Sequence, residues 1–109
     1  MKITSEHGES ATVIHLAGSA DVATVDAIRK ALADGMEKSN QHVVCNLAEM
    51  DFICSDALGA LISAHKEAQA GGGFLRLAHP CRRIAGILAT TQRNRLFPVF
   101  DSLEEALKA

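Results

Sequence analysis

Two hydrophobic spacings alternate along the chain, and together they predict an α/β fold. Residues 11–18 alternate in the manner of a β-strand, with Ile14 and Leu16 on the same face. Ile3 opens a shorter strand before it, and residues 6–10 have the composition of a hairpin turn between the two. The chain is therefore expected to open with a β-hairpin.

The next segment, residues 21–37, carries apolar residues at three- and four-residue intervals, which predicts an amphipathic helix. Its apolar stripe consists of Val22, Val25, Ile28, Leu32 and Met36. Residues 42–47 then form a short apolar run, which is typical of a strand buried on both faces of a parallel sheet.

A second helix is predicted to begin at Ser55 and Asp56, because both residue types are preferred as helix caps. The apolar positions that follow at helical spacing are Ala57, Leu58, Leu61, Ile62, His65 and Ala68. The glycines at residues 71–73 are expected to end this helix.

The last third of the chain repeats the alternation. Residues 74–78 and 97–100 are predicted to be strands, Pro80 to start a third helix, and Asp101 with Ser102 to cap a terminal helix. Strands separated by helices need crossover connections, which make a sheet mostly parallel. The sequence therefore predicts a small mixed sheet of about five strands, opened by a hairpin and packed against about four helices.

The composition fits one domain over residues 1–109 with an aliphatic core, because 48% of the residues are apolar and 22% are charged. A net charge of −2 and the absence of Trp and Tyr argue against direct binding of nucleic acid. No apolar stretch approaches the roughly 20 residues of a membrane span, so we expect a cytoplasmic protein without membrane insertion.

The candidates for catalysis or metal binding do not form a recognisable site. Cys45, Cys54 and Cys81 have no Cys-x-x-Cys spacing, which favours reduced thiols over a disulfide or a metal site. The histidines show no ligand spacing, and His65 is expected to be a half-buried core residue. A nucleophile at Cys54 or Ser55 would need a base that no motif supplies. We therefore expect no enzyme activity, no metal and no cofactor.

The most informative stretch is residues 46–73, where a buried strand runs directly into the second helix with Ser55 at the junction. The hydroxyl can cap the first helical turn, or the same N–H groups can receive a phosphate together with the helix dipole. Simple capping is the more economical interpretation of the residues alone. Asp21 can likewise be the cap of the first helix, which we favour, or a contact for a partner.

Several motifs match one known pattern over nearly the whole chain. Residues 16–21 (LAGSAD) stand where that pattern has a Gly-x-Leu-Asp turn, and residues 43–47 (VVCNL) match its central strand. Residues 52–61 (FICSDALGAL) match its signature, and residues 72–77 and 97–107 match its later strands and terminal helix. On these motifs the chain resembles the STAS domain family, and in particular the bacterial anti-sigma factor antagonists.

The resemblance implies a function in the regulation of transcription. The family signature reads Asp-Ser-Ser-Gly-Leu-Gly or Asp-Ser-Thr-Gly-Leu-Gly, and its first Ser is phosphorylated by a partner anti-sigma factor with serine kinase activity. That position is Ser55 in this chain. The unmodified domain is then expected to bind the anti-sigma factor, which frees the sigma factor. The phosphorylated domain is expected to dissociate from the anti-sigma factor.

Three departures from the family pattern bear on control. Cys54 replaces the Asp before the acceptor, Asp56 replaces the second Ser or Thr, and residues 90–95 (TTQRNR) replace a Thr-Gly-Leu after the third helix. They are compatible with a variant under altered control. The alternative role is a structural STAS subunit of a transporter ATPase or a stress-signalling complex, without phosphorylation.

The resemblance places the partner-binding surface at the junction and the turn of residues 18–21. The expected contact residues are Asp21, Ser55, Asp56, Leu58, Gly59 and Ile62. Weak homodimerisation is left open.

Overall fold

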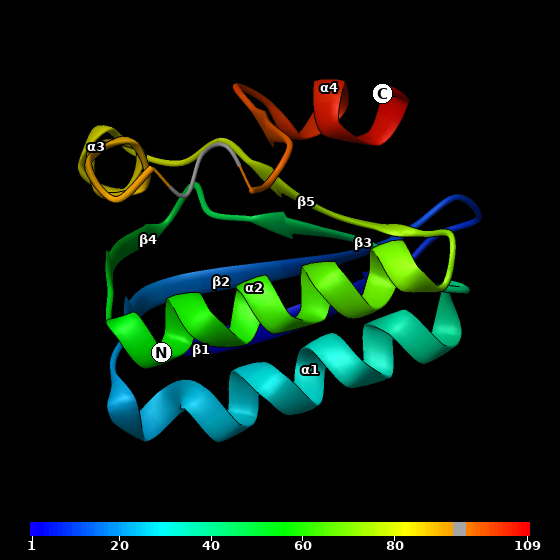
Figure 1. The fold of residues 1–109 in the computed structure, drawn as a ribbon, viewed down its shortest axis with the longest axis horizontal. Helices are drawn as coiled ribbons and strands as arrows, with labels where there is room; N and C mark the ends of the chain where they lie inside the picture. The colour runs from blue at the N-terminus through cyan, green and yellow to red at the C-terminus, as the bar shows by residue number, and fades with distance from the viewer. Residues whose placement is uncertain (93–95) are drawn as a thin grey trace.

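A six-stranded β-sheet forms the centre of the fold (Figure 1). The computed structural model describes residues 1–92 and 96–109. Its strands are β1 (Lys2–His7), β2 (Thr12–Ala20), β3 (His42–Asn46), β4 (Met50–Ile53), β5 (Phe74–Ala78) and β6 (Val99–Phe100). The order is β1-β2-β3-β5-β6, and β4 pairs with β2 outside this path. Only β1 is antiparallel to its neighbour, so the predicted opening hairpin and mostly parallel sheet are confirmed.

The helices cover both faces of the sheet. They are α1 (Val25–Lys38), α2 (Ser55–Ala70), α3 (Arg82–Thr90) and α4 (Leu103–Lys108), with a 3-10 turn, η1 (Val22–Thr24), before α1. Figure 1 shows α1 and α2 side by side on one face, α4 on the opposite face and α3 beside β4. Among the described residues, no helix has the length and apolarity needed to cross a membrane.

The main core lies between the sheet and the α1–α2 layer. Its fully buried large side chains include Ile14, Leu16, Ile28, Leu47, Met50, Leu61, Leu75 and Leu77. A smaller cluster around Val44 and Ala106 fills the space under α4. β3 is buried on both faces, as its continuous apolar run predicted.

The chain before α2 forms two strands, although its sequence predicted one buried strand that runs directly into the helix. β3 ends at Asn46, and the amide of Met50 donates to the carbonyl of Leu47 across a turn. The chain then starts β4, which pairs with β2 instead of β5. Leu47 and Met50 on either side of the turn are both buried, so apolar residues continue across the break, and the exposed Glu49 marks the turn between them.

The first helical segment also begins differently from its prediction. Residues 22–24 form the 3-10 turn, and α1 begins only at Val25. Val22 is 68% exposed and is therefore not part of the buried stripe. A 3-10 turn has three residues per turn, so a residue within it does not stay in phase with an α-helical stripe.

The glycines after α2 let three segments meet closely. Gly72 has a φ of +83°, and the amide of Gly73 donates to the carbonyl of Ala68 over 2.7 Å. A Cβ on Gly73 would lie 2.0 Å from the carbonyl oxygen of Gln41, which itself accepts from the amide of Phe74 over 2.8 Å. Glycine at residue 73 is therefore required for β5 to start beside β3.

We predict that Gly73→Ala lowers the free energy of unfolding by about 2 kcal/mol or more, because backbone must move to accommodate the methyl group. The control is Gly86→Ala in α3, where a Cβ meets no atom within 4 Å. That change should stabilise the fold by about 0.5–1 kcal/mol. Urea denaturation of both variants tests this, and equal stabilities would contradict the close approach at Gly73.

Candidate functional site at the start of α2

The candidate site lies where β2 and β4 end side by side. The two strands pair in parallel, with Ser19 opposite Phe52 and Ala20 opposite Ile53. The amide of Cys54 donates to the carbonyl of Ala20 over 2.8 Å, so the pairing extends to the residue before α2. This pairing holds the end of β2 against the start of α2.

The register of β2 against β4 shifts between Gly18 and Ser19, so Asp51 of β4 has no paired residue in β2. Gly18 has a φ of +99°, a conformation that residues with a side chain rarely adopt. One residue further on, the Ser19 hydroxyl donates to an Asp51 carboxylate oxygen over 2.9 Å. This hydrogen bond joins the exposed ends of the two strands.

Cys54, and not Ser55, caps α2. Cys54 has an extended backbone (φ −85°, ψ 167°), and its Sγ accepts from the amide of Ala57 over 3.4 Å. Ser55 is the first helical residue, so its interpretation as the N-cap is wrong. A capping side chain belongs to the extended residue just before the helix, because only from there does it reach the N–H two or three residues into the helix.

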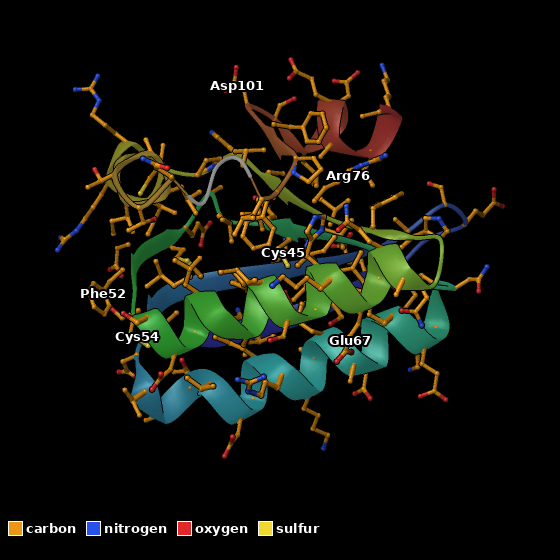
Figure 2. The ribbon with its side chains drawn as sticks, viewed as in Figure 1. Cys45, Phe52, Cys54, Glu67, Arg76 and Asp101 are labelled. Atoms are coloured by element: carbon orange, nitrogen blue, oxygen red, sulfur yellow. The ribbon has the colours of Figure 1, made fainter. Side chains whose placement is uncertain are left out.

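The Ser55 hydroxyl is exposed and, within residues 1–92 and 96–109, makes no hydrogen bond. Asp56 beside it is also exposed. Figure 2 shows that the labelled Cys54 lies at the very start of α2. The cysteine cap therefore leaves the serine hydroxyl accessible at the surface.

The outward side of α2 continues through Gly59 and Ile62, which are both half-buried. Leu58 is only 7% exposed and belongs to the main core, so its expected place on the binding surface is wrong. Each residue turns the helix by about 100°, so Leu58 lies at the edge of the buried face, between Leu61 and Ile62. Its contacts with the core turn the side chain inward.

Asp21 lies at the N-cap position of η1, but its carboxylate accepts no capping hydrogen bond. Its main-chain carbonyl instead accepts from the amide and the hydroxyl of Thr24 over 3.0 and 2.7 Å. The exposed side chain is one of three carboxylates in residues 18–24 and 50–59, with Asp51 and Asp56. Those segments contain no Lys or Arg, so the junction is acidic.

Two exposed apolar residues of this site were missed from the sequence. Phe52 is 38% exposed in β4 and Val22 is 68% exposed in η1, which packs against α2. Figure 2 shows Phe52 beside Cys54 at the end of the molecule where α2 begins. Asp51 was the available signal, because an acid inside a short apolar run indicates that the strand has an open face.

Two titratable groups lie inside the domain. Burial raises the pKa of the Cys45 thiol to about 12, so this thiol stays protonated and is no nucleophile. His65 is 4% exposed, more deeply buried than predicted, and its ring lies 5.3 Å from that of Phe97. In the described part of the chain, no three His, Cys, Asp or Glu side chains group to hold a metal ion.

The model of the STAS domain family matches residues 2–106. This chain therefore belongs to the STAS domain family, and the resemblance inferred from its sequence is confirmed.

Two relatives of this chain are named as anti-sigma factor antagonists. The anti-sigma-F factor antagonist RsfA of Mycobacterium tuberculosis is 29% identical over 113 residues, covering 100% of this chain and 87% of RsfA. The anti-sigma F factor antagonist of Paenibacillus polymyxa is 22% identical over 108 residues, covering 98% of this chain and 92% of that protein.

The Bacillus protein SpoIIAA has the same fold in two states. Its unphosphorylated form superposes with a TM-score of 0.81 at 19% identity, covering 98% of this chain and 94% of SpoIIAA. Its phosphorylated form superposes with a TM-score of 0.74, also at 19% identity, covering 98% and 97%. The predicted STAS-type architecture is therefore confirmed.

The burial of His65 predicts a loss of stability in mild acid. Burial lowers its pKa from the ordinary value of 6.5, so below that pH the unfolded chain binds a proton that the folded chain resists. The free energy of unfolding should therefore fall between about pH 7 and pH 5, and His65→Gln should reduce this dependence. Urea titrations at several pH values measure it, with His79→Gln at an exposed position as the control for losing one imidazole. An unchanged pH dependence in His65→Gln would rule out His65 as the source.

Proposed function

We propose that this chain is an anti-sigma factor antagonist that binds an anti-sigma factor with serine kinase activity and is released by phosphorylation of Ser55. The observation that carries the proposal is the accessible Ser55 hydroxyl, which makes no hydrogen bond to the described part of the chain because Cys54 caps the helix. The names of the relatives and the two states of SpoIIAA support the same role. In this proposal the chain acts in the cytoplasm by binding a partner, and not as an enzyme.

The chemistry of the switch belongs to the partner. The partner would transfer the γ-phosphoryl group of ATP to Ser55 Oγ, while the hydroxyl proton leaves to a base of the kinase. This chain has only to present an exposed hydroxyl on a rigid element. The first turn of α2 meets that need, since Ser55 is held by the helix and by the β2–β4 pairing beneath it.

Phosphorylation changes the charge of a surface that is already acidic. A phosphate adds about −1.5 to −2 charges next to the carboxylates of Asp21, Asp51 and Asp56. The helix dipole stabilises a phosphate at its N-terminus by only about 0.3–1 kcal/mol, whereas desolvating an unpaired ion in an interface costs several kcal/mol. The balance therefore favours dissociation of the modified domain.

The binding surface we propose combines this charge with an apolar contact. It consists of Asp21, Val22, Phe52, Ser55, Asp56, Gly59 and Ile62. Exposed aromatic residues are frequent sources of binding energy at interfaces, so Phe52 would supply much of the apolar contact. An apolar pocket on the partner would match Phe52.

We predict that Ser55→Asp weakens binding of the anti-sigma factor at least tenfold, because a fixed carboxylate enters the acidic surface. Asp56→Ser should tighten binding, because the Asp56 carboxylate is an ion that the interface would otherwise have to desolvate. Isothermal titration measures both. Ser5→Asp, at an exposed serine on β1, controls for one added carboxylate elsewhere.

Incubation with the partner and ATP, followed by mass measurement, completes this test. The mass of the parent should rise by one phosphate, and that of Ser55→Ala should stay constant. If Ser55→Asp binds like the parent and no phosphate is added at Ser55, a structural STAS subunit without phosphorylation becomes the better account.

We further predict that Gly59→Ala stabilises the fold yet weakens binding about tenfold. A Cβ at Gly59 meets no atom within 4 Å, so the helix gains about 0.5–1 kcal/mol, but the methyl group would stand in the contact surface. Gly86→Ala in α3 is the matched control, since it makes the same change at an open helical position away from the junction. Equal affinities of the two variants would exclude Gly59 from the surface.

A further inference from the structure

A groove of about 430 Å³ runs between α1 and α2, away from the Ser55 hydroxyl. Arg29, Ala33 and Glu37 line it from α1, and Ala60, Ala64 and Glu67 line it from α2. Figure 2 shows Glu67 between the two helices. The small side chains keep the middle of the groove open, and the charged side chains stand at its ends.

The charges are ordered along the groove. Arg29, Ala33 and Glu37 are spaced by four residues, so they form one line on α1 about 12 Å long. Figure 1 shows that α1 and α2 run in the same direction, so Glu67 stands at the same end as Glu37. One end of the groove is therefore basic, its centre is lined by small alanine side chains, and its other end is acidic.

The charged side chains of the groove take part in no ion pair among residues 1–92 and 96–109. Between the residues that the structure describes, the ion pairs are His15–Glu6 and Lys108–Glu104, and neither involves the groove. Arg29, Glu37 and Glu67 are all exposed. The groove thus presents both signs of charge to a partner.

We propose that this groove is the contact surface of a homodimer, in which α1 packs antiparallel against α1 of a second copy. A two-fold interface must be complementary to itself, because the same patch meets its own copy in reverse. Reversal about Ala33 brings Arg29 opposite Glu37 of the second copy, with Glu67 of that copy beside it. The two-fold axis repeats this contact at the other end.

The small residue at the crossing point and the two signs of charge in the groove both favour a second copy over an unrelated partner. Alanine at residue 33 lies where the two helices would cross, so their backbones can approach closely. A partner of a single charge sign would be attracted at one end and repelled at the other. The dimer surface does not include Ser55 or Asp56, so a test of dimerisation is independent of the proposed phosphorylation switch.

The experiment is sedimentation equilibrium of the full chain up to about 1 mM, where even weak association is populated. The parent should dimerise. An acidic variant, Arg29→Glu, and a basic variant, Glu37→Arg with Glu67→Arg, should each raise the dimer dissociation constant at least tenfold, because each would face only like charges. Lys30→Glu, an exposed change on the same helix outside the groove, is the control and should dimerise like the parent.

Mixing the two variants gives the decisive result. In a heterodimer every reversed charge meets an opposite one, so the acidic and basic variants should associate with each other at least tenfold more tightly than either does with itself. Circular dichroism establishes that both remain folded. The proposal is overturned if the parent stays monomeric at about 1 mM, if Lys30→Glu weakens association as much as Arg29→Glu, or if the mixture forms no heterodimer.

Discussion

The parallel pairing of β4 with the end of β2 is the constraint on which the candidate site depends. Residues 18–20 and 50–53 are far apart in the chain, and the hydrogen bond from the Cys54 amide to the Ala20 carbonyl brings them together at the start of α2. The main-chain ladder holds this arrangement, so the exposed side chains above it remain available for binding. A different pairing of β4 would separate Asp21 from Ser55.

The capping of α2 by Cys54 determines how the surface around Ser55 would respond to a phosphate. Sulfur is a weak hydrogen-bond acceptor, so the Cys54 cap satisfies the first turn of α2 less well than an oxygen would. Because Cys54 is the cap, the Ser55 hydroxyl is not used to cap α2. A phosphate on that hydroxyl would meet incompletely satisfied N–H groups, while Asp56 and its neighbouring carboxylates oppose the added charge. At this helix end, Cys54 therefore favours binding of a phosphate, whereas Asp56 opposes it.

α2 presents two distinct sides to the exterior. The line through Ser55, Gly59 and Ile62 leads from the junction along one side, and the line through Ala60, Ala64 and Glu67 borders the groove with α1. The inward positions between them, including Leu58 and Leu61, anchor the helix in the core. A single rigid helix therefore supports the site of the proposed switch and the site of proposed self-association without sharing residues between them.

The sequence by itself determined the α/β class, the opening hairpin, the buried central strand and the serine at the strand-to-helix junction. These features follow from local periodicity and from end signals such as Gly71–Gly73 and Ser102, whose hydroxyl does cap α4. Only the tertiary structure decided that β4 is a separate strand beside β2, that Cys54 is the cap, that Leu58 points inward and that Phe52 and Val22 are exposed. Pairing partners, and which side chains at the edge of a helix face turn into the core, depend on contacts between distant residues, and local hydrophobicity does not encode those contacts.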